Sequence, residues 1–219
     1  MMETRRNFIK GILGCLGFVG LLLSPFSRLV RSGLAEAKKI ILPKETKRES
    51  LVSRNPANLD TRNLGITPLQ DFGTMGLSSH EVDLGGWRLE VNGHVKNPLR
   101  LTYKEITSLP SIEREVLQIC PGFFANHGRW KGISMGELLK TAKVEDGITH
   151  VTLKGPRGSY ENLQRFPIED ILSNKVFLAY QVNGHILPQK HGFPLRTVAE
   201  GYYGYDWVKY VDQITVEKI

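Results

Sequence analysis

The sequence predicts one α+β domain in which short strands and short helices alternate irregularly. Residues 87–91 alternate between apolar and polar side chains, which predicts a half-buried strand that ends at the Asn92-Gly93 turn. Thr102–Glu105 and Ser134–Glu137 have the spacing of capping boxes and predict two helix starts, the first helix stopping at Pro110. No β–α–β rhythm and no internal repeat is visible, which favours mixed sheets with short helices.

The second half of the chain continues this mixture. Val151–Leu153 has the alternation of a strand, and Pro167 stands at the first position of a helix that reaches Leu172. Val176–Val182 is an apolar strand, and Asn183-Gly184 is the turn of a hairpin. Val208–Val216 alternates again and predicts a final strand.

The composition is globular, with 41% hydrophobic and 23% charged residues among 219, which is enough chain for one sizeable core. The formal net charge is +7, and removing residues 1–37 leaves 24 basic and 20 acidic residues. No basic run is interleaved with aromatic residues, so the sequence gives no support for nucleic-acid binding.

The N-terminus resembles a bacterial twin-arginine export signal. Arg5-Arg6 precedes an apolar, glycine-rich run at Gly11–Pro25, and Ala35-Glu36-Ala37 matches a cleavage site. An amphipathic start or a single membrane anchor is the alternative, but the run is short for a span of about 20 residues. We expect residues 1–37 to be a signal peptide that directs the folded protein to the periplasm.

Residues 38–63 are rich in charged and small polar residues, and we expect a leader or linker that wraps the surface or is partly disordered. The folded domain is expected over residues 64–219. Residues 66–74 are rich in turn-forming residues, and their pattern assigns no element.

The apolar run Val116–Cys120 predicts a strand with a cysteine at its tip, where Pro121-Gly122 turns the chain away. Cys15 falls in the expected signal peptide, so the mature chain would hold one thiol. Such a cysteine is often a small buried hydrophobe. However, an unpaired thiol in an oxidising compartment is oxidised unless it is buried or used. Cys120 is therefore a candidate ligand for a metal or, alternatively, a nucleophile with His127 as its base.

A second dense region presents cations on an irregular backbone. Residues 187–196 and 201–209 combine prolines, glycines and aromatic residues with His191, Arg196 and Lys209. Arg supplies a rigid fork of donors and Lys a point charge, a combination that suits a phosphate or another anion. The alternative is a surface loop with solvated charges.

Several separated motifs occur together, in the order Ile119-Cys120, Trp130-x-Gly132, Asn183-Gly184, Leu187-Pro188, His191–Arg196 and Val208-Lys209. In this order they resemble the molybdopterin-binding domain of the sulfite oxidase family. The resemblance covers the chain from about Ile66 to its end, and it implies a sulfite-oxidase-type fold.

The resemblance implies that Cys120 is the catalytic thiolate bound to molybdenum and that the cofactor is Mo-molybdopterin. By the same resemblance, the residues around the pterin and its phosphate are His191, Arg196, Trp207, Val208 and Lys209. Further cofactor contacts are implied at Gly155 and, upstream, at Gln70, Gly73 and Thr74. A soft thiolate suits such a metal, and cationic groups suit the phosphate.

Two departures from the family bear on the substrate. The stretch Phe72–Thr74 lacks the arginine that helps sulfite oxidases hold their anionic substrate, and the chain ends before their active-site tyrosine. We therefore expect two-electron oxo transfer with an S-oxide or N-oxide rather than sulfite, on a small molecule or a protein.

No haem motif or dimerisation domain is present in the sequence, so we expect a monomer that exchanges electrons with a separate haem protein or membrane redox subunit. A binding protein of the same family that has lost activity is the remaining alternative.

Overall fold

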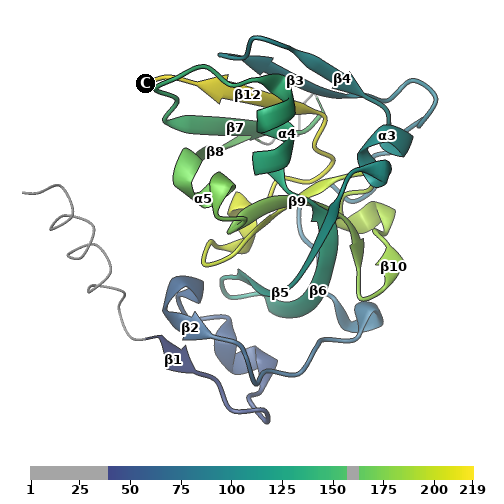
Figure 1. Cartoon of the computed structure of the whole chain (residues 1–219). Helices are drawn as coiled ribbons and strands as arrows, with labels where there is room; N and C mark the ends of the chain where they lie inside the picture. Colours follow the sequence, from purple (N-terminus) through teal and green to yellow (C-terminus); the bar gives the residue numbers. More distant parts are fainter. Residues whose placement is uncertain (1–38, 157–162) are drawn as a thin grey trace, which may run out of the picture. The chain divides into compact units, whose positions relative to one another are not determined.

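The computed structural model describes residues 39–156 and 163–219, which belong to one compact unit running from Lys39 to Ile219 (Figure 1). The signal peptide expected over residues 1–37 lies outside the described residues. The domain start expected at Leu64 does not coincide with a break, because residues 39–63 pack in the same unit. Within the described ranges, no helix is long and apolar enough to cross a membrane.

Two five-stranded sheets form the body of the domain. The first sheet has the order β10-β9-β6-β5, with β11 also paired to β9, and all its neighbours are antiparallel. Its strands are β5 (Ser111–Cys120), β6 (Phe124–Ile133), β9 (Val176–Val182), β10 (His185–Ile186) and β11 (Arg196–Ala199).

The second sheet has the order β4-β3-β12-β7-β8 and lies at the top of Figure 1. Only β3 and β12 are parallel among its neighbours. Its strands are β3 (Leu89–Gly93), β4 (Leu99–Leu101), β7 (His150–Lys154), β8 (Leu163–Pro167) and β12 (Gln213–Glu217).

Short helices connect and flank the sheets, and one main hydrophobic core joins residues of both sheets, such as Leu89 of β3 and Phe177 of β9. The α-helices are α3 (Tyr103–Ser108), α4 (Met135–Ala142) and α5 (Ile168–Leu172). The 3-10 helices are η1 (Arg48–Leu51), η2 (Pro56–Asn58), η3 (Leu69–Asp71), η4 (Gln189–His191) and η5 (Gly204–Asp206). The predicted α+β class, with mixed sheets and short helices, is confirmed.

The predicted helix starts are close to the observed ones. Thr102 and Glu105 form both halves of a capping box at α3. At α4 only the Ser134 half forms, since its hydroxyl accepts from the Glu137 amide at 3.4 Å. The helix expected to begin at Pro167 begins one residue later, and Pro167 ends β8 instead.

The final strand begins later in the chain than the predicted range Val208–Val216, since the observed strand is Gln213–Glu217. Tyr210 has a φ of 55°, which interrupts an extended chain. The Val211 amide donates to the Leu195 carbonyl at 2.8 Å, outside a regular ladder. Val208, Tyr210 and Val211 are buried although this segment forms no regular strand.

The β5–β6 hairpin has two different faces, and this decides where its side chains act. Cys120 is the last residue of β5 and pairs with Phe124, while Leu117 pairs with His127. Because successive side chains of a strand point to opposite sides, these two pairs lie on opposite faces. The strand tip predicted for Cys120 is therefore present, although the partner strand β6 was not predicted.

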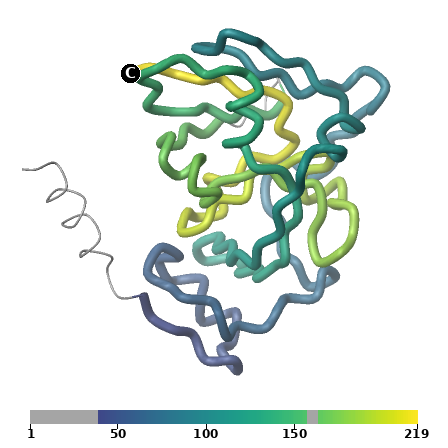
Figure 2. The backbone as a smooth tube through the Cα atoms, viewed as in Figure 1, coloured from purple at the N-terminus to yellow at the C-terminus, as the bar shows by residue number. Residues whose placement is uncertain are grey.

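Residues 39–64, the purple and blue segment of Figure 2, pack through their buried leucines against the face of the hairpin opposite Cys120. Phe72 instead packs against Trp130 and His191 on the side of Cys120. β1 (Ile40–Ile41) and β2 (Leu59–Asp60) pair in parallel within this segment. A second hydrophobic cluster joins the segment to the hairpin and consists of Leu42, Leu51, Leu59, Leu64, Leu117, Ile119 and Ala125. The part of the expected leader that is described, residues 39–63, therefore contributes to a core.

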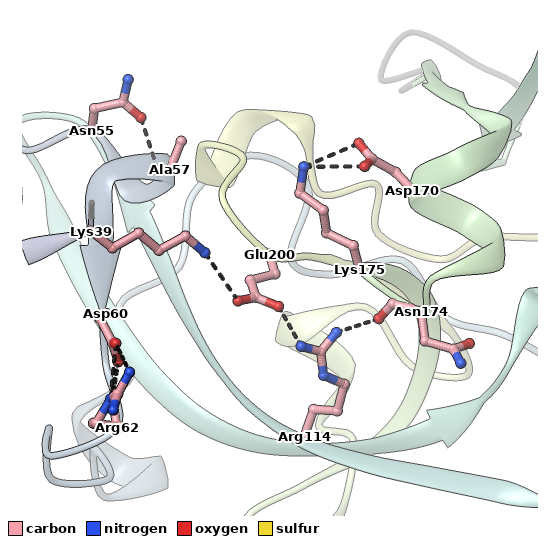
Figure 3. Close-up of polar contacts among 10 residues, drawn as sticks. All are labelled: Lys39, Asn55, Ala57, Asp60, Arg62, Arg114, Asp170, Asn174, Lys175 and Glu200. Atoms are coloured by element: carbon pink, nitrogen blue, oxygen red, sulfur yellow. Dashed lines mark hydrogen bonds and ion pairs between the residues drawn. The ribbon is translucent and has the colours of Figure 1, made fainter. Parts of the chain in front are cut away.

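Ion pairs attach the start of this segment to the rest of the unit (Figure 3). The Lys39 ammonium lies 3.8 Å from a Glu200 carboxylate oxygen, and the other oxygen accepts from Arg114. Arg114 also donates to the Asn174 carbonyl. Lys39 is thus linked through Glu200 to β5, the strand that carries Cys120.

Candidate active site

A cavity of about 300 Å³ opens at the tip of β5, a volume at the lower end of the range for small-molecule sites. It is lined by residues of the hairpin, of the segment 73–77 and of the irregular chain between β11 and β12. Of the residues predicted from the sequence, it brings together Gly73, Thr74, Cys120, His191, Arg196, Trp207 and Lys209.

Three predicted cofactor contacts do not line this cavity. Gln70 is exposed in η3, and Val208 is buried in the main core. Gly155 lines a separate cavity of about 460 Å³ on the second sheet, while its neighbour Pro156 lines the first.

Cys120 presents its thiol to the cavity while remaining 7% exposed. Its Sγ lies 3.8 Å from the Sδ of Met75. Burial raises the pKa of the thiol, and the positive charge of Lys209 opposes that rise. A metal ion must displace the thiol proton on binding, and Lys209 supports the resulting thiolate.

His127, the base in the thiol-enzyme alternative, lies on the other face of the hairpin. It is fully buried, its Nδ1 lies 3.2 Å from the Gly65 carbonyl, and it does not line the cavity. Burial lowers the pKa of His127. The seven-residue spacing from Cys120 suggested proximity, but the strand register places the two side chains on opposite faces of the hairpin. The alternative in which His127 is the base for a Cys120 nucleophile is therefore wrong.

Arg196 places a buried cation in the wall of the cavity. Its side chain is 1% exposed, and its Cζ lies 5.0 Å and 5.3 Å from the ring centres of Trp130 and Trp207. Nη1 donates to the His191 carbonyl at 3.1 Å, whereas Nη2 has no partner among the described residues. Burial lowers the pKa of Arg196 to about 9, so it remains charged at neutral pH.

His191 and Trp207 add two more buried polar groups. His191 Nε2 and Trp207 Nε1 also have no hydrogen-bond partner within the described chain. Burial, followed by the charges of Arg196, Lys190 and Lys209, lowers the pKa of His191 to about 3, so its ring is neutral. Buried polar atoms without partners are costly, and here they surround one cavity. They fit a ligand that is anionic and rich in acceptors, as molybdopterin is.

Lys209 connects the cavity wall to the segment 74–77. Its Nζ lies within 3.0 Å of four oxygens, namely Thr74 Oγ1 and the carbonyls of Met75, Leu77 and Lys190. Burial, followed by the charge of Arg196, lowers the pKa of Lys209 to about 8.

Two buried amides that the sequence did not single out hold the upstream segment. Asn126 accepts from the Gly73 amide at 3.0 Å and donates to its carbonyl at 2.9 Å and to Gln118 at 3.3 Å. A Cβ on Gly73 would lie 2.3 Å from the Phe124 ring, so glycine is required for this approach. Gln118 and Asn126 lie on the same face of the hairpin as Cys120. Polar side chains within a buried strand are the sequence signal that could have identified them as site residues.

Comparisons with known proteins indicate the same class of cofactor. The sequence profile of the oxidoreductase molybdopterin binding domain matches residues 76–218, which include Cys120 and Arg196. The nitrate reductase [NADH] of Volvox carteri is 30% identical over 162 residues, a region that covers 60% of this chain and 19% of that protein.

Two bacterial proteins are similar over a comparable region. The uncharacterized oxidoreductase YuiH of Bacillus subtilis is 29% identical, covering 62% of this chain and 68% of that protein. The protein-methionine-sulfoxide reductase catalytic subunit MsrP of Gluconobacter oxydans is 27% identical, covering 58% of this chain and 46% of that protein.

The crystal structure of the sulfane dehydrogenase SoxCD from Paracoccus pantotrophus shares the fold, with a TM-score of 0.61 and 24% identity over 64% of this chain and 40% of that chain. The chain thus spans less than half of MsrP, of the nitrate reductase and of SoxCD. It belongs to the oxidoreductase molybdopterin-binding domain family, of the sulfite oxidase type that its motifs indicated, and molybdopterin is its cofactor.

Proposed function

We propose that this protein is an oxidoreductase that transfers an oxygen atom in a two-electron reaction and prefers an S-oxide or N-oxide to sulfite. One observation carries the proposal: a single thiol, Cys120, shares its cavity with a buried cation, Arg196, whose Nη2 has no partner in the described chain. A metal-binding sulfur beside an anion-binding wall is what a molybdenum centre with a phosphate-bearing pterin needs.

Cys120 would supply the protein's ligand to the metal. Within the described residues there is no group of three or more His, Cys, Asp or Glu side chains arranged to hold a metal ion. The dithiolene sulfurs of the cofactor would therefore provide the other sulfur ligands. Arg196, His191 and Trp207 would bind the pterin and its phosphate through their free polar atoms.

The bound cofactor supplies the two-electron chemistry, and the chain supplies position and environment. Trp207, Arg196 and neutral His191 form a buried part of the cavity wall, where electrostatic interactions are stronger than in bulk water. Neutral His191 has one nitrogen that donates and one that accepts, so it can orient a ligand without adding charge.

The substrate preference follows from the charges near the thiol. Among the described residues that line the cavity, only Arg196 and Lys209 are cationic, and Lys209 already contacts four oxygens of the chain. Three residues are candidate replacements for the missing arginine, namely Arg129, Lys131 and Arg157. Arg129 pairs with Glu115 at 2.9 Å, and Lys131 does not line the cavity. Arg157 lies outside the described residues. A dianion such as sulfite would be poorly compensated, whereas a neutral oxide needs no further cation.

The proposal includes export and a partner. The Arg5-Arg6 motif supports twin-arginine export to the periplasm. In this proposal the cofactor exchanges electrons singly with a separate haem protein or membrane redox subunit.

The test uses the full chain produced in molybdenum-replete cells. We expect about one molybdenum and one pterin per chain, and faster reduction of a sulfoxide than oxidation of sulfite on the same preparation. Faster sulfite oxidation would overturn the substrate preference. Full cofactor occupancy without any turnover would favour the inactive binding protein.

A further inference from the structure

Residues Thr74–Leu77, here called the cover segment, line the cavity together with Cys120. Met75 is 44% exposed, yet its Sδ is 3.8 Å from the Cys120 Sγ, which belongs to a side chain only 7% exposed. The Met75 side chain therefore reaches both solvent and the thiol. Removing it would open a direct path to the sulfur.

The cover segment has no helix or strand of its own, so its position depends on side-chain contacts. Lys209 provides most of them, since its Nζ is 2.8 Å from Thr74 Oγ1, 2.9 Å from the Met75 carbonyl and 3.0 Å from the Leu77 carbonyl. An ammonium group has three protons to donate, so this segment alone can use all of them. Asn126 fixes the preceding residue, Gly73, through both its amide and its carbonyl.

We propose that the cover segment controls access to Cys120, with Met75 as the specificity-determining residue and Lys209 as the residue that positions it. Methionine is flexible and uncharged, so it can move aside for a small neutral molecule at little cost. A bulky molecule must displace the whole segment and break the contacts of Lys209. Met75 thus selects by size at the thiol.

The proposal rests on Cys120 being the reacting sulfur of the proposed function, but its first test does not require activity. The full chain is prepared without cofactor, and alkylation of Cys120 by iodoacetamide is followed by mass spectrometry of its peptide. Reading the peptide keeps Cys15 out of the measurement. Thiol reactivity follows access as well as pKa, so we expect Met75→Ala to react about tenfold faster or more than wild type.

Met75→Leu is the matched control. Leucine keeps nearly the same volume without sulfur, so its rate should stay within about threefold of wild type. An unchanged rate for Met75→Ala, or a rate for Met75→Leu as high as for Met75→Ala, would overturn the proposal. Met75 is exposed, so both variants are expected to fold.

Lys209→Met tests the positioning role, with Lys190→Met as its control, because Lys190 contributes only its carbonyl to the cluster. Loss of even one hydrogen bond from a charged group should raise the limiting rate of Cys120 alkylation at high pH at least about tenfold, equal to about 1.4 kcal/mol, separately from any change in thiol pKa. A limiting rate in Lys209→Met no higher than in wild type would remove Lys209 from this role.

A readout on the loaded enzyme separates this proposal from the proposed function. Met75→Ala should lower the KM for methyl phenyl sulfoxide more than for dimethyl sulfoxide, with a larger change in KM than in kcat. If alkylation follows expectation but no sulfoxide is reduced, the cover segment controls access to Cys120 and the proposed function is wrong. If sulfoxides are reduced but Met75→Ala changes neither the alkylation rate nor the KM, the proposed function is supported and the proposal that the cover segment controls access is wrong.

Discussion

Replacing Arg196 by methionine would separate its contribution to cofactor binding from its contribution to the fold. Burial lowers the pKa of this guanidinium from 12.5 to about 9, which corresponds to a cost on the order of 5 kcal/mol for the charged form in the folded protein. Because the unfolded chain holds this proton more tightly, the cost is fully present at neutral pH and is relieved only above pH 9 or so.

Contacts of the guanidinium offset this cost. Its hydrogen bond to the His191 carbonyl contributes about 1.5–3 kcal/mol, since the donor is charged. Each contact with the rings of Trp130 and Trp207 contributes about 0.5–2 kcal/mol. Methionine would keep part of the ring packing. The stabilisation from these contacts nearly cancels the cost of burying the charge. We therefore expect Arg196→Met to change the unfolding free energy of the cofactor-free protein by less than about 2 kcal/mol.

Cofactor binding should respond far more strongly. A charge-assisted hydrogen bond from Nη2 to a phosphate contributes about 1.5–3 kcal/mol, so its loss should weaken binding about 10- to 150-fold. The assay combines urea unfolding of the cofactor-free variant with molybdenum content from cells grown at limiting molybdate. Arg114→Met is the control, since Arg114 pairs with Glu200 and does not line the cavity.

Two results would refute this reasoning. Wild-type molybdenum content in Arg196→Met would mean that the guanidinium does not bind the cofactor. A destabilisation above about 4 kcal/mol, in the range of large core losses, would mean that any loss of occupancy is structural.

Other predictions address the thiol, the sheet and the signal. Cys120→Ser should fold and lose oxygen-atom transfer, because a hydroxyl is a poor ligand for a soft metal site; unchanged turnover would remove Cys120 from the site. Gly132→Ala should lower the unfolding free energy by about 3 kcal/mol, because its Cβ would lie 1.8 Å from the Leu178 carbonyl oxygen, a backbone atom; a loss below about 1 kcal/mol would show that β6 and β9 part easily. Replacing Arg5 and Arg6 by lysine should leave the precursor in the cytoplasm on fractionation, and its export would exclude the twin-arginine route.

The elements that the sequence predicted are those with a local signal. The capping box at Thr102 needs only four residues, and the strand Val176–Val182 with its Asn183-Gly184 turn is equally local. Strand β6 gave no such signal, because Asn126 and the two glycines of Phe124–Ile133 interrupt its apolar pattern. Those residues make contacts with distant parts of the chain, such as the hydrogen bond of Asn126 with Gly73.

The candidate site divides in the same way. Cys120, His191 and Arg196 belong to short motifs, and the structure brings them to one cavity. The cover segment was not predicted, because Lys209 and Thr74 are 135 positions apart and no spacing rule links them. Sequence patterns reached the proposed metal ligand and cofactor contacts, whereas the residues proposed to restrict access required the fold.

The β5–β6 hairpin explains why the chain before the cavity matters to the cavity. A slip of one residue between its two strands would invert one strand relative to the other, so that either Cys120 would face the second hydrophobic cluster or His127 would face the cavity. Three contacts oppose such a slip: the Asn126–Gly73 bonds, the Trp130 indole bond to the Val116 carbonyl at 3.1 Å, and the close approach of Gly132 to β9. The apolar residues of 39–64 add a fourth, since they would meet polar groups in any shifted register. The segment expected to be a leader therefore helps to set the side of the hairpin on which the thiol lies.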